Sequence, residues 1–184
     1  MLWAENRSNC QTPVQLKEPP GNSANTQAGD AATAMEKLSF LVGHWSGEGW
    51  IQLGPGQRRT FVETESVQRK AGGALLQIEG LGRAVLPGKQ EPVTVHDAFA
   101  LMWFYSKTVA YRFLAFRAGG EAIDSNAVVG DKSLVWGFRD PRAGEIRFTI
   151  VLNQKGQWFE IGETSNDGKE WRKFFEMTLD RNRP

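Results

Sequence analysis

The segment RTFVETESVQ at residues 59–68 alternates between two kinds of side chain over its whole length. One face carries Phe61, Glu63, Glu65 and Val67, whereas the other face carries mainly Thr and Ser. Successive side chains of a β-strand point to opposite faces, so a period of two is typical of a strand with one buried side. The segment is therefore predicted to be a strand in a sheet that has an inner and an outer face.

Most of the chain around this segment has a similar pattern that is typical of strands. Further strands are predicted at residues 45–53, 74–81, 94–105, 110–117, 122–129, 133–138, 145–152, 157–164 and 170–179. Several are separated by glycine-containing pairs that suit the positive φ of hairpin turns, namely Gly119-Gly120, Gly130-Asp131, Lys155-Gly156 and Asp167-Gly168. No helical segment long enough for a parallel crossover lies between them, so the sheet should be antiparallel. About ten hairpin-linked strands favour an all-β, up-and-down β-barrel, which leaves no open edge; a two-sheet sandwich is the alternative.

The residues before the first strand fall into two parts. Residues 34–42 are predicted to form a short helix, with Thr33 as its N-cap and Gly43 at its end. Residues 1–33 contain three prolines and many polar residues without apolar periodicity, and we expect them to form a flexible tail. The barrel domain is therefore expected to occupy residues 34–184.

Composition excludes several classes of function. The 184 residues include 22 Lys and Arg against 21 Asp and Glu, a net charge of +1, whereas a general nucleic-acid-binding protein has a strong basic excess. No apolar run approaches the roughly 20 residues of a membrane helix, and the N-terminal residues lack the pattern of a secretory signal. The single cysteine, Cys10, cannot form an internal disulfide. We expect no nucleic-acid partner, no membrane span and, by default, a cytoplasmic location; the oligomeric state stays open.

A family resemblance begins at the helix-to-strand corner. The stretch LSFLVGHWSGEG at residues 38–49 resembles the opening of calycin-type barrels, in which a short helix closes one end and a Gly-x-Trp motif begins the first strand. The stretches VHDA at 95–98 and FFEMTL at 174–179 extend the likeness. From about residue 35 to residue 181 the chain resembles bacterial lipocalin-like proteins of unknown function and, more distantly, nitrobindin-type barrels.

The resemblance has two implications. In lipocalin-like barrels the Trp of the motif packs near a basic residue from a late strand; here Trp45 would meet Arg181 or Arg172, in a cation–π contact of about 0.5–2 kcal/mol. Nitrobindin-type barrels bind haem through a histidine of the final strand, but residues 170–180 contain no histidine. Haem ligation of that kind is therefore not expected, and no cofactor is predicted.

A barrel of this size is wide enough to enclose a small ligand. We therefore predict binding of a small hydrophobic or amphipathic ligand, without assuming catalysis. The candidate binding residues are Trp50, Glu65, Glu79, His96, Trp103, Tyr111, Phe113 and Arg117. Any carboxylate that points inward must be paired, hydrated or protonated, because an isolated buried charge is very costly. An inward acid paired with Arg112 or Arg117 would form a polar anchor, although each candidate also fits an ordinary surface or framework role.

The sequence does not decide which face of the sheet lines the cavity. If the hairpin pairs Tyr105 with Tyr111, one face combines the odd-numbered aromatic residues of 99–105 with Tyr111, Phe113 and Arg117. The opposite face then holds His96 and the small side chains around it. The first face would be an aromatic wall with one guanidinium, and the second would leave room for a ligand.

Two other functions remain open. No Gly-x-Ser-x-Gly elbow and no HExxH or paired CxxC spacing is present, so neither a catalytic nucleophile nor a metal site is expected. An enzyme is still possible if His96 exchanges a proton with an inward acid such as Glu65 or Glu79 in the cavity. The third possibility is an interaction module whose barrel is filled by its own aromatic side chains.

Overall fold

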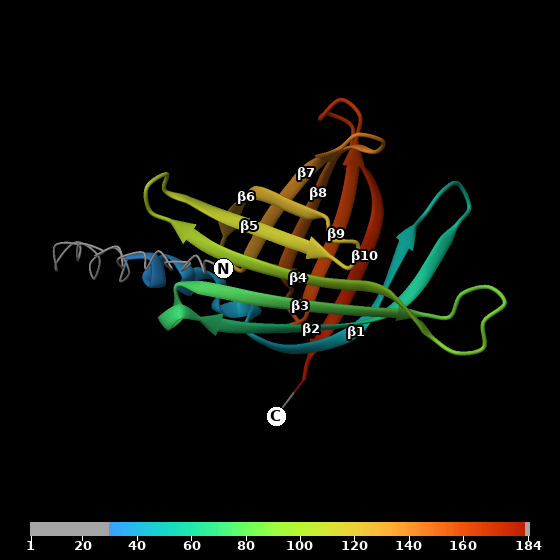
Figure 1. Cartoon of the computed structure of the whole chain (residues 1–184), viewed down its shortest axis with the longest axis horizontal. Helices are drawn as coiled ribbons and strands as arrows, with labels where there is room; N and C mark the ends of the chain where they lie inside the picture. Colours follow the sequence, from blue (N-terminus) through green and yellow to red (C-terminus); the bar gives the residue numbers. More distant parts are fainter. Residues whose placement is uncertain (1–29, 183–184) are drawn as a thin grey trace, which may run out of the picture.

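Consecutive strands are joined by short turns and form one continuous antiparallel meander (Figure 1). The computed structural model describes residues 30–182. Its strands are β1 (Gly43–Gln52), β2 (Arg58–Lys70), β3 (Leu75–Ala84), β4 (Val93–Tyr105), β5 (Ala110–Arg117), β6 (Ala122–Gly130), β7 (Ser133–Asp140), β8 (Gly144–Leu152), β9 (Trp158–Ser165) and β10 (Arg172–Arg181). All ten predicted strands are confirmed. Cys10 and most of the predicted tail lie outside the described residues.

The first and last strands close the sheet into a barrel. β1 pairs with β2 on one side and with β10 on the other, from Trp45 opposite Arg181 to Ile51 opposite Phe175. Every other strand pairs with its neighbours in sequence. The β2–β5 half crosses the β7–β10 half steeply (Figure 1). The predicted barrel is confirmed and the alternative sandwich is wrong, because β1 and β10 join the two edges of the sheet.

The helix begins earlier than predicted. Residues 30–35 are already helical, and the 3₁₀ helix η1 (Glu36–Leu41) continues them. Thr33 therefore lies within the helical segment and is not its N-cap. The three alanines of residues 31–34 have the highest helix propensity, which favours this earlier start. The hydroxyl of Tyr111 donates a hydrogen bond to the carbonyl oxygen of Ala34 at 2.8 Å and ties the segment to the barrel. No helix among residues 30–182 is long and apolar enough to cross a membrane.

A tryptophan–arginine pair joins this helix to both ends of the sheet. The guanidinium of Arg181 lies 4.1 Å from the ring centre of Trp45. It also donates hydrogen bonds to the carbonyl oxygens of Phe40, at 2.7 Å, and of Val42. The predicted contact is therefore confirmed with Arg181, whereas Arg172 lies exposed at the start of β10.

The register of one hairpin decides which side chains face inward. β4 and β5 pair Phe104 with Tyr111 and Tyr105 with Ala110, so the pairing of Tyr105 with Tyr111 is wrong by one residue. A slip of one residue moves every side chain of a strand to the other face. Tyr111, Phe113 and Arg117 consequently share the inner face with His96, while Trp103 lies outside.

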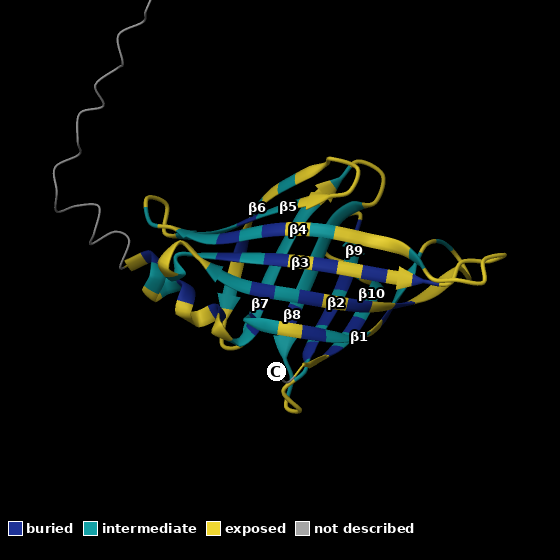
Figure 2. Cartoon of the chain, turned by 60° about the horizontal axis from the view of Figure 1, so that its bottom comes forward, coloured by how far each residue is buried: buried dark blue, intermediate teal, exposed yellow. Residues whose placement is uncertain are grey.

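Burial differs between the two ends of the barrel. At the helix end the inner face is closed by side chains that are at most 1% exposed, including Leu38, Trp45, Leu76 and Leu134. Along β2 and β3 buried and exposed residues alternate, as expected for a wall with two faces (Figure 2). At the opposite end several inner-face side chains remain half-buried or exposed. One end of the barrel is thus packed, and the other is accessible to solvent.

Candidate functional site

Two glycines of β3 make room for two acidic side chains of β2. The register places Glu63 opposite Gly82 and Glu65 opposite Gly80. A Cβ atom at Gly80 would lie 2.7 Å from Oε1 of Glu65, and one at Gly82 would clash with Oε2 of Glu63. Both carboxyl groups therefore lie directly over the backbone of β3 on the inner face.

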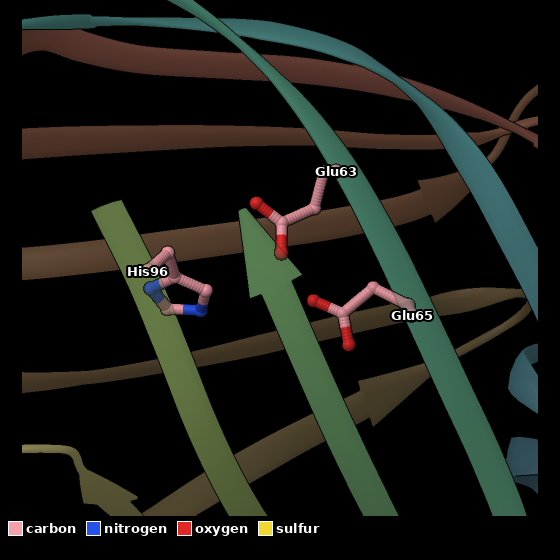
Figure 3. Close-up of side chains that lie close together, drawn as sticks. All are labelled: Glu63, Glu65 and His96. Atoms are coloured by element: carbon pink, nitrogen blue, oxygen red, sulfur yellow. The ribbon is translucent and has the colours of Figure 1, made fainter. Parts of the chain in front are cut away.

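The next strand brings a histidine to the same place. His96 of β4 pairs with Gly82, so Glu63, Gly82 and His96 form a row across three strands. Figure 3 shows both glutamates extending across β3 toward His96. Ligand atoms of Glu63, Glu65 and His96 all lie within 4.8 Å of one another. We call these three residues the lumen cluster.

The two glutamates of the lumen cluster are buried, and each has a carboxyl oxygen without a hydrogen-bond partner in the part of the chain that the structure describes. Glu63 is 3% exposed and Glu65 is 9% exposed, and neither Oε1 of Glu63 nor Oε2 of Glu65 has a hydrogen-bond partner among the described residues. Burial, followed by the nearby Glu160, raises the pKa of Glu63 to about 8. Burial, followed by Glu63 and Glu160, raises the pKa of Glu65 well above its usual range. Burial therefore favours the protonated, uncharged form of both carboxyl groups unless a cation compensates their charge.

A third inward glutamate lies on the opposite wall. Glu160 of β9 is 7% exposed, and Nε1 of Trp158 donates a hydrogen bond to its Oε2 at 3.0 Å. Burial raises the pKa of Glu160 to about 7, although the Trp158 hydrogen bond opposes the shift. Glu160 thus has a partner that the glutamates of the lumen cluster lack.

His96 marks the accessible end of the cluster. Its side chain is exposed at the start of β4, yet surrounding atoms desolvate the ring enough to lower its pKa. The cationic Arg117 lowers this pKa further, and Asp97 opposes the shift. The imidazole is therefore neutral at pH 7 and keeps one nitrogen lone pair available.

An almost continuous chain of aromatic rings lines the lumen beside these acids. Phe113 stacks on Trp136 at 4.3 Å between ring centres, Trp136 stacks on Phe148 at 4.8 Å, Phe148 meets Phe175 edge-on at 5.8 Å, and Phe175 stacks on Phe61 at 5.7 Å. We call these five residues the aromatic chain. Phe113 and Phe61 are buried, but the other three are only half-buried although they face inward. These three rings therefore keep part of their apolar surface exposed.

The barrel wall is weakest between β6 and β7. These strands pair only over residues 127–130 and 133–136, so the first half of β6 is hydrogen-bonded to β5 alone. Nearby, the guanidinium of Arg117 lies 5.7 Å from the ring centre of Phe138, and the hydroxyl of Ser125 is buried without a partner among the described residues. The basic side chain of Arg117 thus lies where the lumen opens.

The structure divides the predicted site residues between two faces. Glu65, His96, Tyr111, Phe113 and Arg117 face the lumen. The other three, Trp50, Glu79 and Trp103, lie on the outer face. Arg58 covers the outer ring of Trp50 at 3.6 Å. Glu79 lies opposite Ser66 of β2 and Phe99 of β4 on the outer face, so it is not an acid of the lumen and cannot be the inward partner of His96.

Some of the lumen residues were absent from the predicted set. Glu63 completes the cluster, Glu160 adds the third acid, and Trp136, Phe148 and Phe175 carry the accessible apolar surface. One signal for the acids was present, because Gly80 and Gly82 follow the same period of two as Glu63 and Glu65. Glycines at this spacing remove the side chains from one face of a strand, which leaves space for acids on its neighbour.

The comparisons with known proteins support the fold. No family model and no curated protein matches the chain. A solved structure, "Crystal Structure of Rv2717c from M. tuberculosis", matches with a TM-score of 0.57 and 17% sequence identity, covering 84% of this chain and 100% of that one. At this identity the likeness shows the barrel fold alone, and no comparison supports membership of the lipocalin-like or nitrobindin-type families.

Proposed function

We propose that the barrel binds a small, largely apolar molecule in its lumen. The observation that carries this proposal is the half-buried inner face of Trp136, Phe148 and Phe175, which lies on the inside of a closed barrel. Burying apolar surface contributes about 25 cal/mol for each Å², so an apolar ligand covering these rings would bind favourably. A barrel filled by its own side chains would bury the same rings completely.

The ligand is expected to be amphipathic. Its apolar body would lie along the aromatic chain, with ring stacking on Trp136 as a favourable geometry. Its polar or acidic end would lie at the open end, near the guanidinium of Arg117, whose present ion pair with Glu121 is long at 3.7 Å and exposed. The incomplete pairing of β6 with β7 offers a route of entry beside this arginine.

Native mass spectrometry of the purified full-length protein tests the proposal first. A co-purified molecule in 1:1 ratio, identified after denaturation, would support a binding barrel and give its chemical class. Titration with 1-anilinonaphthalene-8-sulfonate, an apolar probe with one anionic group, then measures access to the lumen. We expect saturable binding that quenches tryptophan fluorescence.

A pair of neighbouring substitutions distinguishes the lumen from the outer surface. Ala98→Trp places a large ring on the half-buried inner face, whereas Phe99→Trp places one on the outer face of the same strand. Ala98→Trp should weaken probe binding at least tenfold, and Phe99→Trp should leave it unchanged. Ala115→Trp, on the inner face of β5, repeats the test if Ala98→Trp unfolds. Equal affinity in all folded variants would overturn the proposal.

A further inference from the structure

We propose that the lumen cluster of Glu63, Glu65 and His96 is a binding site for a divalent first-row transition-metal ion. This site is independent of the apolar ligand, because the cluster occupies the β2–β4 wall and the aromatic chain runs mainly along the other strands.

The geometry already brings three donors from three side chains together. Their ligand atoms lie within 4.8 Å of one another. Zinc and similar ions hold oxygen and nitrogen donors at about 2.0–2.2 Å, which places donors of one ion about 3–4 Å apart. Small side-chain rotations would shorten the distances between the donor atoms to this range. Gly80 and Gly82 leave the space that these rotations need, since a Cβ atom at either position would collide with a carboxyl group.

The unpartnered carboxyl oxygens of the site favour a cation. Oε1 of Glu63 and Oε2 of Glu65 are buried without a hydrogen-bond partner among the described residues, and neither side chain takes part in a described ion pair. Unpartnered buried polar groups are costly, and this cost needs an explanation wherever it persists. One divalent ion would neutralise both carboxylates and satisfy their oxygens together.

The donor set selects the class of metal. Two carboxylates and one imidazole suit zinc, manganese, iron or cobalt, whereas calcium and magnesium prefer oxygen ligands alone. Three protein donors leave at least one coordination position open, as in catalytic rather than structural sites. His96 at the accessible end of the cluster would place that open position within reach of solvent and of molecules in the lumen.

Isothermal titration calorimetry with Zn²⁺ tests the site directly. The experiment uses the full chain with Cys10→Ser, which removes the one thiol that would compete for the ion. We expect 1:1 binding, with Glu63→Gln and His96→Gln each lowering the affinity at least tenfold. Co²⁺ provides a second readout, because binding to the cluster should change its visible absorption bands.

The chain supplies a matched control for each type of ligand. His44 is the only other histidine, and both His44 and Glu79 lie on the outer face. His44→Gln and Glu79→Gln should therefore retain wild-type affinity. Circular dichroism of the metal-free variants checks that each is folded, and Glu65→Gln replaces Glu63→Gln if the latter is not.

Three results would overturn the metal site: no 1:1 binding by the wild type, retained affinity in folded His96→Gln, or equal loss in His44→Gln. Binding of the anilinonaphthalene probe tests the proposed function separately from the metal site. Probe binding without Zn²⁺ binding would reject the metal site alone, and Zn²⁺ binding without probe binding would reject the apolar-ligand proposal alone.

Discussion

At the scale of single residues, two glycines determine where the acids of the lumen lie. Gly80 and Gly82 have no side chains, so the carboxyl groups of Glu65 and Glu63 lie over the backbone of β3. With larger residues at these positions, the two acids would have to turn away from His96. The lumen cluster therefore depends on these glycines as much as on its donor residues.

Gly82→Ala should disturb both stability and the cluster. Its Cβ would collide with the Glu63 carboxyl group and with Cβ of His96, and overpacking of this kind costs about 1–3 kcal/mol. Urea denaturation measures the loss. Gly119→Ala is the control, because nothing lies within 4 Å of a Cβ atom there and its change should stay within about 0.5 kcal/mol. Equal effects of the two substitutions would contradict the close packing over β3.

Glu160 should make stability fall as the pH rises. Its pKa is about 7 in the folded protein against an ordinary value of 4.5, so the folded state binds more protons between these values. Its stabilising contribution is complete below about pH 4.5 and is lost as the pH passes through 7. At about 1.4 kcal/mol for each pKa unit, the loss amounts to at most about 3.5 kcal/mol.

Urea denaturation in EDTA between pH 5 and 8 measures this dependence. Glu63 and Glu65 contribute with the same sign, whereas the lowered pKa of His96 opposes them. We expect the three glutamates to outweigh the one histidine, so the wild type should lose stability across this range. Glu160→Gln should reduce the slope, because the amide does not titrate in this range and its oxygen can still accept the Trp158 hydrogen bond. An unchanged slope in Glu160→Gln would show that the carboxyl group of Glu160 does not titrate in this range.

At the scale of elements, the helix, the first strand and the last strand are joined at one point. Arg181 lies against the ring of Trp45 and donates to the carbonyl oxygens of Phe40 and Val42. These carbonyl groups lie where the helix ends, and they have lost their helical partners. One side chain therefore caps the helix and fixes the ends of β1 and β10.

Arg181→Met should lower the free energy of unfolding by about 1–3 kcal/mol, because it removes a cation–π contact and two charge-assisted hydrogen bonds. Thermal unfolding measures the effect as a lower Tm. Arg172→Met is the matched control, since Arg172 lies exposed at the other end of the same strand. A comparable fall in both variants would argue against the specific role of Arg181.

At the scale of the whole molecule, the barrel combines a packed end with an accessible one. The helix covers the packed end, where Leu38, Leu41 and Trp45 are at most 1% exposed. At the other end His96 of the lumen cluster and Arg117 share the opening with half-buried aromatic rings. This asymmetry allows a closed β-barrel to be stable and still retain accessible surface inside.

Hydrogen exchange should identify the weak part of the wall. Amides of residues 122–126 have a hydrogen-bonding neighbour on one side only, whereas β9 is paired on both sides. We expect faster exchange in residues 122–126 than in β9, measured by mass spectrometry of peptides. Saturation with anilinonaphthalene sulfonate should slow exchange in residues 122–126 if ligands enter between β6 and β7. Equal protection of the two segments would contradict a weak β6–β7 wall.

The pattern of residues along the chain was sufficient to predict the strands and the barrel. Alternation over two-residue periods and glycine-containing turns are local properties, and they predicted all ten strands. The contact of Trp45 with a basic residue of the last strand also followed from the resemblance of residues 38–49, which left Arg181 and Arg172 open, and the structure shows Arg181. The start of the helix was wrong, because strong helix formers at residues 31–34 extend it beyond the expected cap.

The candidate site was predictable only in part. The sequence by itself determined the strands, the turns and the presence of paired acids on one face of β2. Only the tertiary structure decided that Tyr111 lies opposite Phe104, and thus that Phe113 and Arg117 face inward while Trp103 does not. The physical reason is that a strand's periodicity is local, whereas its register depends on the turn and on packing across the barrel. Glu63, Gly82 and His96 meet only after three strands have paired, and no spacing along the chain encodes that contact.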